Sequence, residues 1–114
     1  MSLLPNAAGA KIPDAKISRY LLDPNHSVQA AAKVRFFEAY GFSRTHWREL
    51  RQALLDHPRL NSVTARIATS FGEKYEVSCS LATPDGRNPC IISVWITEPA
   101  DPDPRLVTAY PNPP

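Results

Sequence analysis

The sequence predicts an α+β fold, with about three N-terminal helices packed on one face of a three- or four-stranded antiparallel sheet. Before residue 60, apolar residues recur every three to four positions, the period of helices with one buried face. From Asn61 onward the period changes to two, as in strands. The segment Pro84–Arg87 is a strong hairpin signal, because its glycine accepts a positive φ and its proline presets the first corner.

The helices are bounded by local signals. The first is expected to start at Pro13, a favoured first helical position. The second is expected to follow an N-cap at Ser27 and to stop at Gly41, which can adopt a left-handed conformation. The third is expected to end before Pro58, because proline removes a helical hydrogen bond. Residues 1–11 are expected to form an N-terminal strap.

The second half of the chain contains alternating segments that predict strands at Ser62–Ser70, Tyr75–Thr83, Asn88–Thr97 and Arg105–Tyr110. The acidic, proline-rich segment Glu98–Pro104 is expected to be a loop. The proline-rich tail 111–114 is expected to end the sheet, because proline cannot donate ladder hydrogen bonds. A length of 114 residues suits one domain, so residues 1–114 are expected to fold as a single unit.

A hairpin in which Pro84 pairs with Arg87 would make one face of the two central strands wholly apolar. The other face would carry Glu76, Ser78, Ser80, Ile91, Ser93 and Trp95. With helices on the apolar face, this second face is a usable binding platform, although solvated antiparallel sheets look the same. The same register makes Cys79 and Cys90 diagonal small core residues, which argues against a disulfide between them.

Composition excludes several classes of protein. The net charge is only +2, but residues 33–66 hold seven basic and three acidic residues, while the chain from residue 67 holds three and six. A polyanion would meet the middle of the chain more readily, although an ordinary mixed surface fits equally. No apolar run approaches the roughly 18 residues of a membrane span, and no secretory leader is recognisable, so no membrane association and a cytoplasmic location are expected. No zinc spacing, phosphate loop or serine elbow is present, so neither a metal nor a cofactor is expected.

His26 and Lys33 are candidates for proton transfer and for charge stabilisation. They are seven residues apart, about two helical turns, and could face the same way. A histidine can take a proton from a ribose hydroxyl, and a lysine can stabilise a charged phosphorane. The alternative is that His26 caps the helix and that Lys33 is exposed to solvent.

Thr108 and Tyr110 share a side of the last expected strand with Leu106. If Val107 and Ala109 pack inward, the two hydroxyls point outward and can hold a phosphate. The opposite orientation makes Leu106 a core residue and Tyr110 a partly buried edge aromatic. The sequence leaves both orientations open.

Several motifs occur in a characteristic order. The stretch Lys16–Phe42 contains a Tyr-Leu-Leu helix, an Asn-His turn, a helix with a lysine and phenylalanines, and Gly-Phe. Tyr75, the Pro84–Arg87 turn, Trp95 and the ending Pro104–Pro111 follow. From about Ile12 to Pro111, this order resembles a family of small uncharacterised bacterial domains. Related stretches open the C-terminal toxin modules of contact-dependent and other polymorphic toxins.

That family is similar in architecture to the barnase/colicin/RelE-like ribonuclease superfamily, in which helices precede a four-stranded antiparallel sheet. The resemblance implies metal-independent RNA cleavage, in which a ribose 2′-hydroxyl attacks the neighbouring phosphate. It matches His26 and Lys33 to the family's histidine and lysine, and Thr108 and Tyr110 to its terminal strand motif. The sequence departs from the toxin pattern at Ser27, where the toxin version has proline.

The first functional hypothesis is therefore an RNA endonuclease of the bacterial toxin type, with RNA as substrate and an immunity or antitoxin protein as partner. In it, His26 is the acid or base, and Lys33 and Arg66 offset phosphate charge. Thr108 and Tyr110 position the phosphate. Such a protein would act in the cytoplasm, or be delivered into a target cell as part of a larger toxin.

The second hypothesis is a non-catalytic interaction domain. It would present the open sheet face or the sheet edge to a protein partner. In either hypothesis the open face, with Glu76 and Trp95, is the expected contact surface.

Overall fold

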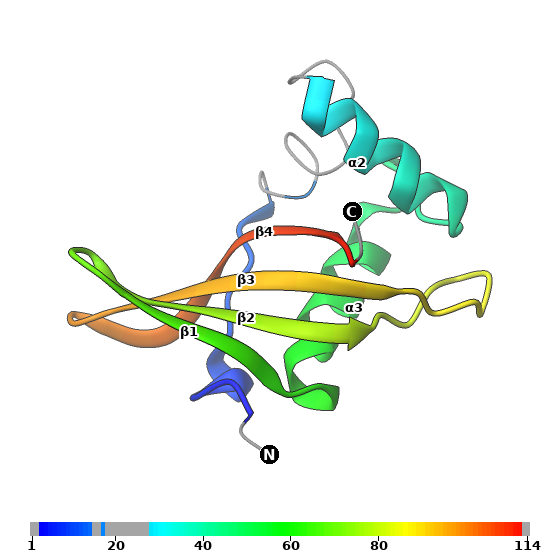
Figure 1. Ribbon diagram of the computed structural model, residues 1–114. Helices are drawn as coiled ribbons and strands as arrows, with labels where there is room; N and C mark the ends of the chain where they lie inside the picture. The colour runs from blue at the N-terminus through cyan, green and yellow to red at the C-terminus, as the bar shows by residue number, and fades with distance from the viewer. Residues whose placement is uncertain (1–2, 15–16, 18–27, 113–114) are drawn as a thin grey trace.

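A four-stranded antiparallel sheet forms the body of the computed structural model, which describes residues 3–14, 17 and 28–112 (Figure 1). Its strands lie side by side in chain order: β1 (Val63–Thr69), β2 (Gly72–Ser80), β3 (Cys90–Glu98) and β4 (Asp101–Pro111). Antiparallel neighbours can be joined by short turns, so this order needs no crossover. The α+β class and the antiparallel sheet that the sequence predicts are confirmed.

The described residues contain a short 3-10 helix, η1 (Ala7–Gly9), and the α-helices α2 (Val28–Ala39) and α3 (Trp47–Leu60). Most of the expected first helix lies outside the described residues. Helix α3 contains Pro58, so the prediction that it ends before this proline was wrong. The ring of Pro58 is buried, and this burial offsets the loss of one amide hydrogen bond.

Helix α2 stops at Gly41, as predicted. Gly41 has a φ of 102°, and the Phe42 amide donates to the Phe37 carbonyl across 3.2 Å, which is the pattern of a Schellman cap. A Cβ atom on Gly41 would lie 3.0 Å from the Cβ of Pro84. Glycine therefore both ends the helix and lets the β2–β3 turn approach it.

Strand β4 starts earlier than the sequence predicts. Residues 101–104 belong to it, so the prediction of a loop over Glu98–Pro104 was wrong. Its prolines are tolerated because β4 lies at the edge of the sheet. Outside this edge, the Lys11 amide donates to the Pro104 carbonyl and the Leu106 amide donates to the Lys11 carbonyl, across 2.8 and 3.1 Å. The N-terminal segment thus forms a short parallel bridge beside β4.

The register between β2 and β3 is one residue away from the predicted one. The turn closes from Thr83, whose carbonyl accepts from the Gly86 amide across 3.0 Å. Asn88 adds a further residue with a φ of 49° on the β3 side. Tyr75 therefore pairs with Trp95. A slip of one residue exchanges the two faces of a strand, so the predicted faces of β3 are reversed.

The inner face of the sheet, defined as the face toward α3, carries Tyr75, Val77, Ile91, Ser93, Trp95, Leu106 and Ala109. Trp95 is 0% exposed, so the prediction that it lies on an open face was wrong. Helix α3 contacts β2 and β3 and lies behind the sheet in Figure 1. Helix α2 instead contacts β4, so the expectation that the helices share one face differs from the structure.

Candidate functional site

A β-bulge decides which side chains of β4 point away from the core. The register against β3 shifts so that Val107 is an extra residue between Leu106 and Thr108. Leu106 and Ala109 are consequently both buried, three residues apart. Thr108 and Tyr110 then belong to the opposite, outer face. The hydroxyls point outward and Leu106 is a core residue, which combines parts of the two orientations that the sequence left open.

Lys33 of α2 reaches across to β4. Its Nζ donates to Thr108 Oγ1 over 3.0 Å in a part-buried contact between residues 75 positions apart. A threonine hydroxyl that accepts a hydrogen bond retains its own hydrogen to donate. The pair therefore presents an ammonium and a hydroxyl hydrogen close together, and the structure brings two of the predicted catalytic residues into contact.

Glu76 and Tyr110 lie on the same outer face. Glu76 pairs with Val94 and Val94 with Thr108, so the carboxylate and the threonine occupy one row across three strands. Burial, and then the negative charge of Glu76, raise the pKa of Tyr110. The phenol therefore stays protonated at neutral pH and can act as a hydrogen-bond donor.

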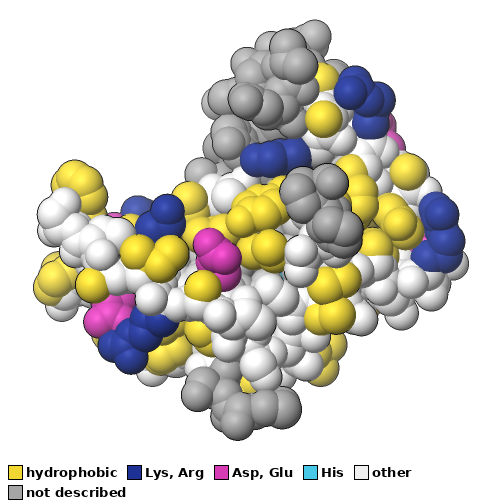
Figure 2. All heavy atoms as spheres, in the orientation of Figure 1, with side chains coloured by type: hydrophobic (Ala, Val, Ile, Leu, Met, Phe, Trp, Pro, Cys, Tyr) yellow, Lys and Arg dark blue, Asp and Glu magenta, His cyan; other side chains and the backbone are white. Residues whose placement is uncertain are grey.

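We call Lys33, Glu76, Thr108 and Tyr110 the outer-face cluster. Figure 2 shows this side of the molecule: hydrophobic side chains surround an acidic group near the middle of the sheet, and basic side chains lie above it at α2. Val94, between Glu76 and Thr108, is 4% exposed. The polar groups thus neighbour a buried valine, and an apolar surrounding strengthens electrostatic interactions with a bound charge.

His26, the predicted acid or base, lies outside the described residues. Helix α2 starts at Val28, two residues later. The role of His26 stays a prediction.

Arg66 does not join the cluster. A register shift between Val63 and Ala65 places it opposite Tyr75, on the inner face of β1. There its Nη2 donates to Glu73 Oε1 across 2.8 Å, and its guanidinium carbon lies 5.7 Å from the centre of the Tyr75 ring. The hydrogen bond to Arg66 is the main cause of the lowered pKa of Glu73. The bulge in β1, which sequence alternation did not reveal, separates Arg66 from the predicted catalytic residues.

Trp95 belongs to a buried hydrogen-bonded chain. Its ring N–H donates to Ser93 Oγ over 2.9 Å, and Ser93 Oγ lies 2.8 Å from Nδ1 of His57. His57 Nε2 lies 2.8 Å from the carbonyl oxygen of Cys79, which can only accept. His57 therefore carries a proton on Nε2, and burial lowers its pKa, which favours the neutral ring. Trp95 is a core residue here, inaccessible as a platform for a ligand.

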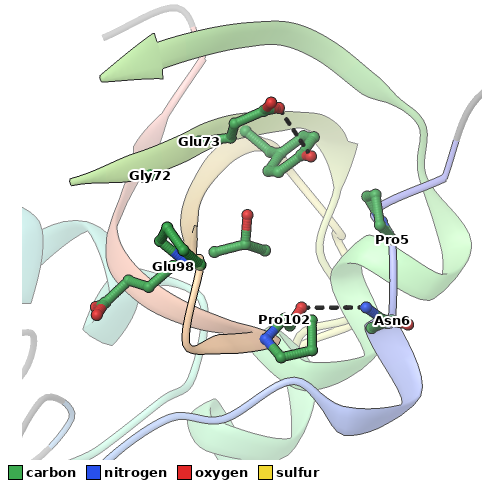
Figure 3. A pocket seen from close by; sticks show the side chains of 9 residues that line it. Pro5, Asn6, Gly72, Glu73, Glu98 and Pro102 are labelled. Carbon is green, nitrogen blue, oxygen red and sulfur yellow. Dashed lines mark hydrogen bonds between the residues drawn. The ribbon is translucent and has the colours of Figure 1, made fainter. Parts of the chain in front are cut away.

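A pocket elsewhere on the sheet is lined by Pro5, Asn6, Gly72, Glu73, Tyr75, Thr97, Glu98, Pro99 and Pro102 (Figure 3). Two hydrogen bonds join polar groups of this pocket to one another. The Tyr75 hydroxyl donates to Glu73 across 3.1 Å, and the Asn6 amide donates to the Pro102 carbonyl across 3.1 Å. The Glu98 side chain points away from the pocket in Figure 3. None of the predicted catalytic residues lines it.

Within residues 3–14, 17 and 28–112, no three His, Cys, Asp or Glu side chains gather as a metal site would require. The described helices are too short or too polar to cross a bilayer.

The fold is shared with a solved structure. One chain of a contact-dependent growth inhibition toxin–immunity protein complex from Klebsiella pneumoniae 342 matches 88% of this chain and 97% of its own length. The TM-score is 0.70 and the identity is 10%, so this likeness establishes the fold. No curated protein matches the sequence. Residues 3–113 match DUF6883, a domain of unknown function, and the chain belongs to this family.

Proposed function

We propose that the chain is a toxin module that cleaves RNA without a metal ion, at the outer-face cluster. The observation that carries this proposal is the 3.0 Å contact of Lys33 with Thr108, which joins α2 to β4 at the face not covered by α3. Two further polar groups, Glu76 and Tyr110, belong to the same face. A metal-independent ribonuclease needs such a set: a cation, hydroxyl donors and groups that exchange protons.

The proposed reaction is the attack of a ribose 2′-oxygen on the adjacent phosphorus, which breaks the bond to the 5′-oxygen. Negative charge grows on the non-bridging phosphate oxygens during this step. The Lys33 ammonium and the hydroxyls of Thr108 and Tyr110 donate hydrogen bonds to these oxygens and lower the barrier. Because its pKa is raised, Tyr110 keeps the hydrogen that this role requires.

Proton transfer is assigned to His26, which takes the 2′-hydroxyl proton or protonates the leaving 5′-oxygen. Glu76 binds the substrate by accepting hydrogen bonds from ribose hydroxyls or base amino groups.

The toxin assignment draws on the fold shared with a chain of a toxin–immunity protein complex. On this proposal, an immunity protein neutralises the domain, and delivery into a target cell occurs as part of a larger toxin. A second candidate is an immunity-like role, because that complex contains both kinds of protein. Induced expression separates the two: a toxin arrests growth, whereas an immunity protein leaves growth unchanged.

The direct test incubates purified protein with a labelled RNA in the presence of a metal chelator. We expect cleavage by the wild type, and a loss of roughly 100-fold or more in rate for Lys33→Met. Arg66→Gln is the matched control, since it removes a cation from the opposite face of the sheet and should cleave at the wild-type rate. Intact RNA after incubation with folded wild-type protein would refute the ribonuclease proposal.

A further inference from the structure

The two cysteines of the chain, Cys79 and Cys90, meet where β2 and β3 approach their connecting turn. Cys79 pairs with Ile91 and Ser80 pairs with Cys90, so the cysteines are diagonal neighbours on adjacent strands. Strand spacing of about 5 Å and a rise of about 3.3 Å per residue put their Cα atoms about 6 Å apart, within the range that a disulfide spans.

The backbone at Cys79 changes where its side chain points. Strict alternation would send the Cys79 and Cys90 side chains to opposite faces, which would forbid a bond. Cys79 instead has a φ of 127°, outside the strand region, so alternation fails at this residue. Burial, and then the neighbouring Cys79 thiol, raise the pKa of Cys90, so the two thiols lie close together, with Cys79 exposed and Cys90 half-buried. The Cys79 sulfur is therefore accessible to solvent, and the Cys90 sulfur lies next to it.

Contacts on both sides hold the pair in place. The buried ring of His57 donates from Nε2 to the Cys79 carbonyl across 2.8 Å, which supports the unusual conformation of Cys79. The Asn112 amide donates to the Cys90 carbonyl across 3.0 Å, and the Asn112 side chain lies 3.8 Å from Cys90 Sγ. Neither cysteine needs a large backbone movement to reach the other.

We propose that Cys79 and Cys90 are a redox-active pair, which forms an intramolecular disulfide by exchange with a small-molecule disulfide. The exposed Cys79 thiolate attacks the small disulfide, which releases one thiol and leaves a mixed disulfide on Cys79. The Cys90 thiolate then attacks the Cys79 sulfur and releases the second thiol. One small disulfide is reduced to two thiols, the two cysteines are oxidised, and the two cysteine protons end on the released thiols.

The proposed order, in which Cys79 reacts first, follows from the solvent exposure and the thiol acidity of the two cysteines. Burial, and then the neighbouring Cys79 thiol, raise the pKa of Cys90, so Cys90 presents less thiolate to an external reagent. The bond would tie β2 to β3 in an oxidising compartment and open in a reducing one. Its formation requires no RNA, so the test is independent of the proposed ribonuclease activity.

The test incubates the folded chain with oxidised glutathione, and then measures intact mass and the free thiols remaining after denaturation. We expect both thiols to disappear from a monomer whose mass falls by two hydrogens, together with a melting temperature several degrees above that of the reduced protein. Reduction with dithiothreitol should restore both thiols.

Cys90→Ser is the matched control, since the exchange should stop at a glutathione adduct on Cys79. Cys79→Ser should react more slowly, because Cys90 alone is half-buried. Wild-type protein that keeps both thiols, gains stable glutathione adducts or forms linked dimers would overturn the proposal. Denatured wild-type protein shows that the reagent is active.

Discussion

The two faces of the sheet differ in how their polar groups are used. On the inner face, a chain of hydrogen bonds within the core joins Trp95, Ser93 and His57. On the outer face, Lys33 and Thr108 meet in a part-buried contact, and the threonine keeps a hydrogen to donate. The same sheet thus carries a buried polar network on one face and, on the other, a part-buried polar contact with a helix.

Residue type alone therefore does not identify a site. Trp95 and His57 are the kinds of side chain that bind nucleic acids, yet both are 0% exposed in the structure. Function is better sought where polar groups of different elements converge outside the core, and variants on the two faces should therefore separate stability from activity.

The largest effect on stability is expected for Trp95→Ala, which removes most of a fully buried side chain on the inner face. We expect it to lower the free energy of unfolding by about 3–5 kcal/mol, measured by urea denaturation. Phe71→Ala is the control, since Phe71 is 76% exposed in the β1–β2 turn and should change stability little. Similar urea midpoints for the two variants would contradict the assignment of Trp95 to the core.

The next effect concerns the pH dependence of stability through His57. Burial lowers its pKa below the ordinary value of 6.5, so at acidic pH the unfolded chain binds more protons than the folded one. This contribution to stability is present above pH 6.5 and is lost as the pH falls toward the folded pKa, by at most about 1.4 kcal/mol per pH unit.

The contribution of His57 is measured as the difference in urea midpoint between wild type and His57→Gln across this pH range. The variant should have a flatter slope between neutral pH and the folded pKa. An identical slope in both proteins would show that His57 is not the group responsible.

The smallest effect on stability is expected for Tyr110→Phe on the outer face, where one hydroxyl is removed and the ring is kept. The urea midpoint should stay close to that of the wild type, because the structure gives this hydroxyl no role in the core. Its RNA cleavage rate should nevertheless fall by roughly 10- to 100-fold, because a donor to the phosphate is lost. A large loss of stability with unchanged cleavage would reverse the proposed division between the faces.

Local signals predicted the elements well where the physical cause is local. Gly41 ends α2 because only a left-handed residue allows this cap. The change of period at Asn61 predicted the switch from helix to sheet. The start of β4 and the end of α3 were predicted less well. The edge position of β4 tolerates its prolines, and the burial of Pro58 compensates for the hydrogen bond that α3 loses there.

The candidate site was predicted in part. Lys33 and Thr108, matched through the resemblance to toxin modules, do meet in the structure. Glu76 lies on their face as the sequence suggested, whereas Arg66 lies on the other. Trp95 was misplaced because the turn closes from Thr83 and moves the register by one residue.

The order of helices and strands follows from the sequence alone, because period, caps and turn propensities act over a few residues. The face that each strand residue occupies depends instead on how the strands pair in the folded chain. The β2–β3 turn and the bulges in β1 and β4 each shift the pairing by one residue, and one residue is enough to move a side chain from core to surface. The same kind of local irregularity, at Cys79, turns one thiol toward the other.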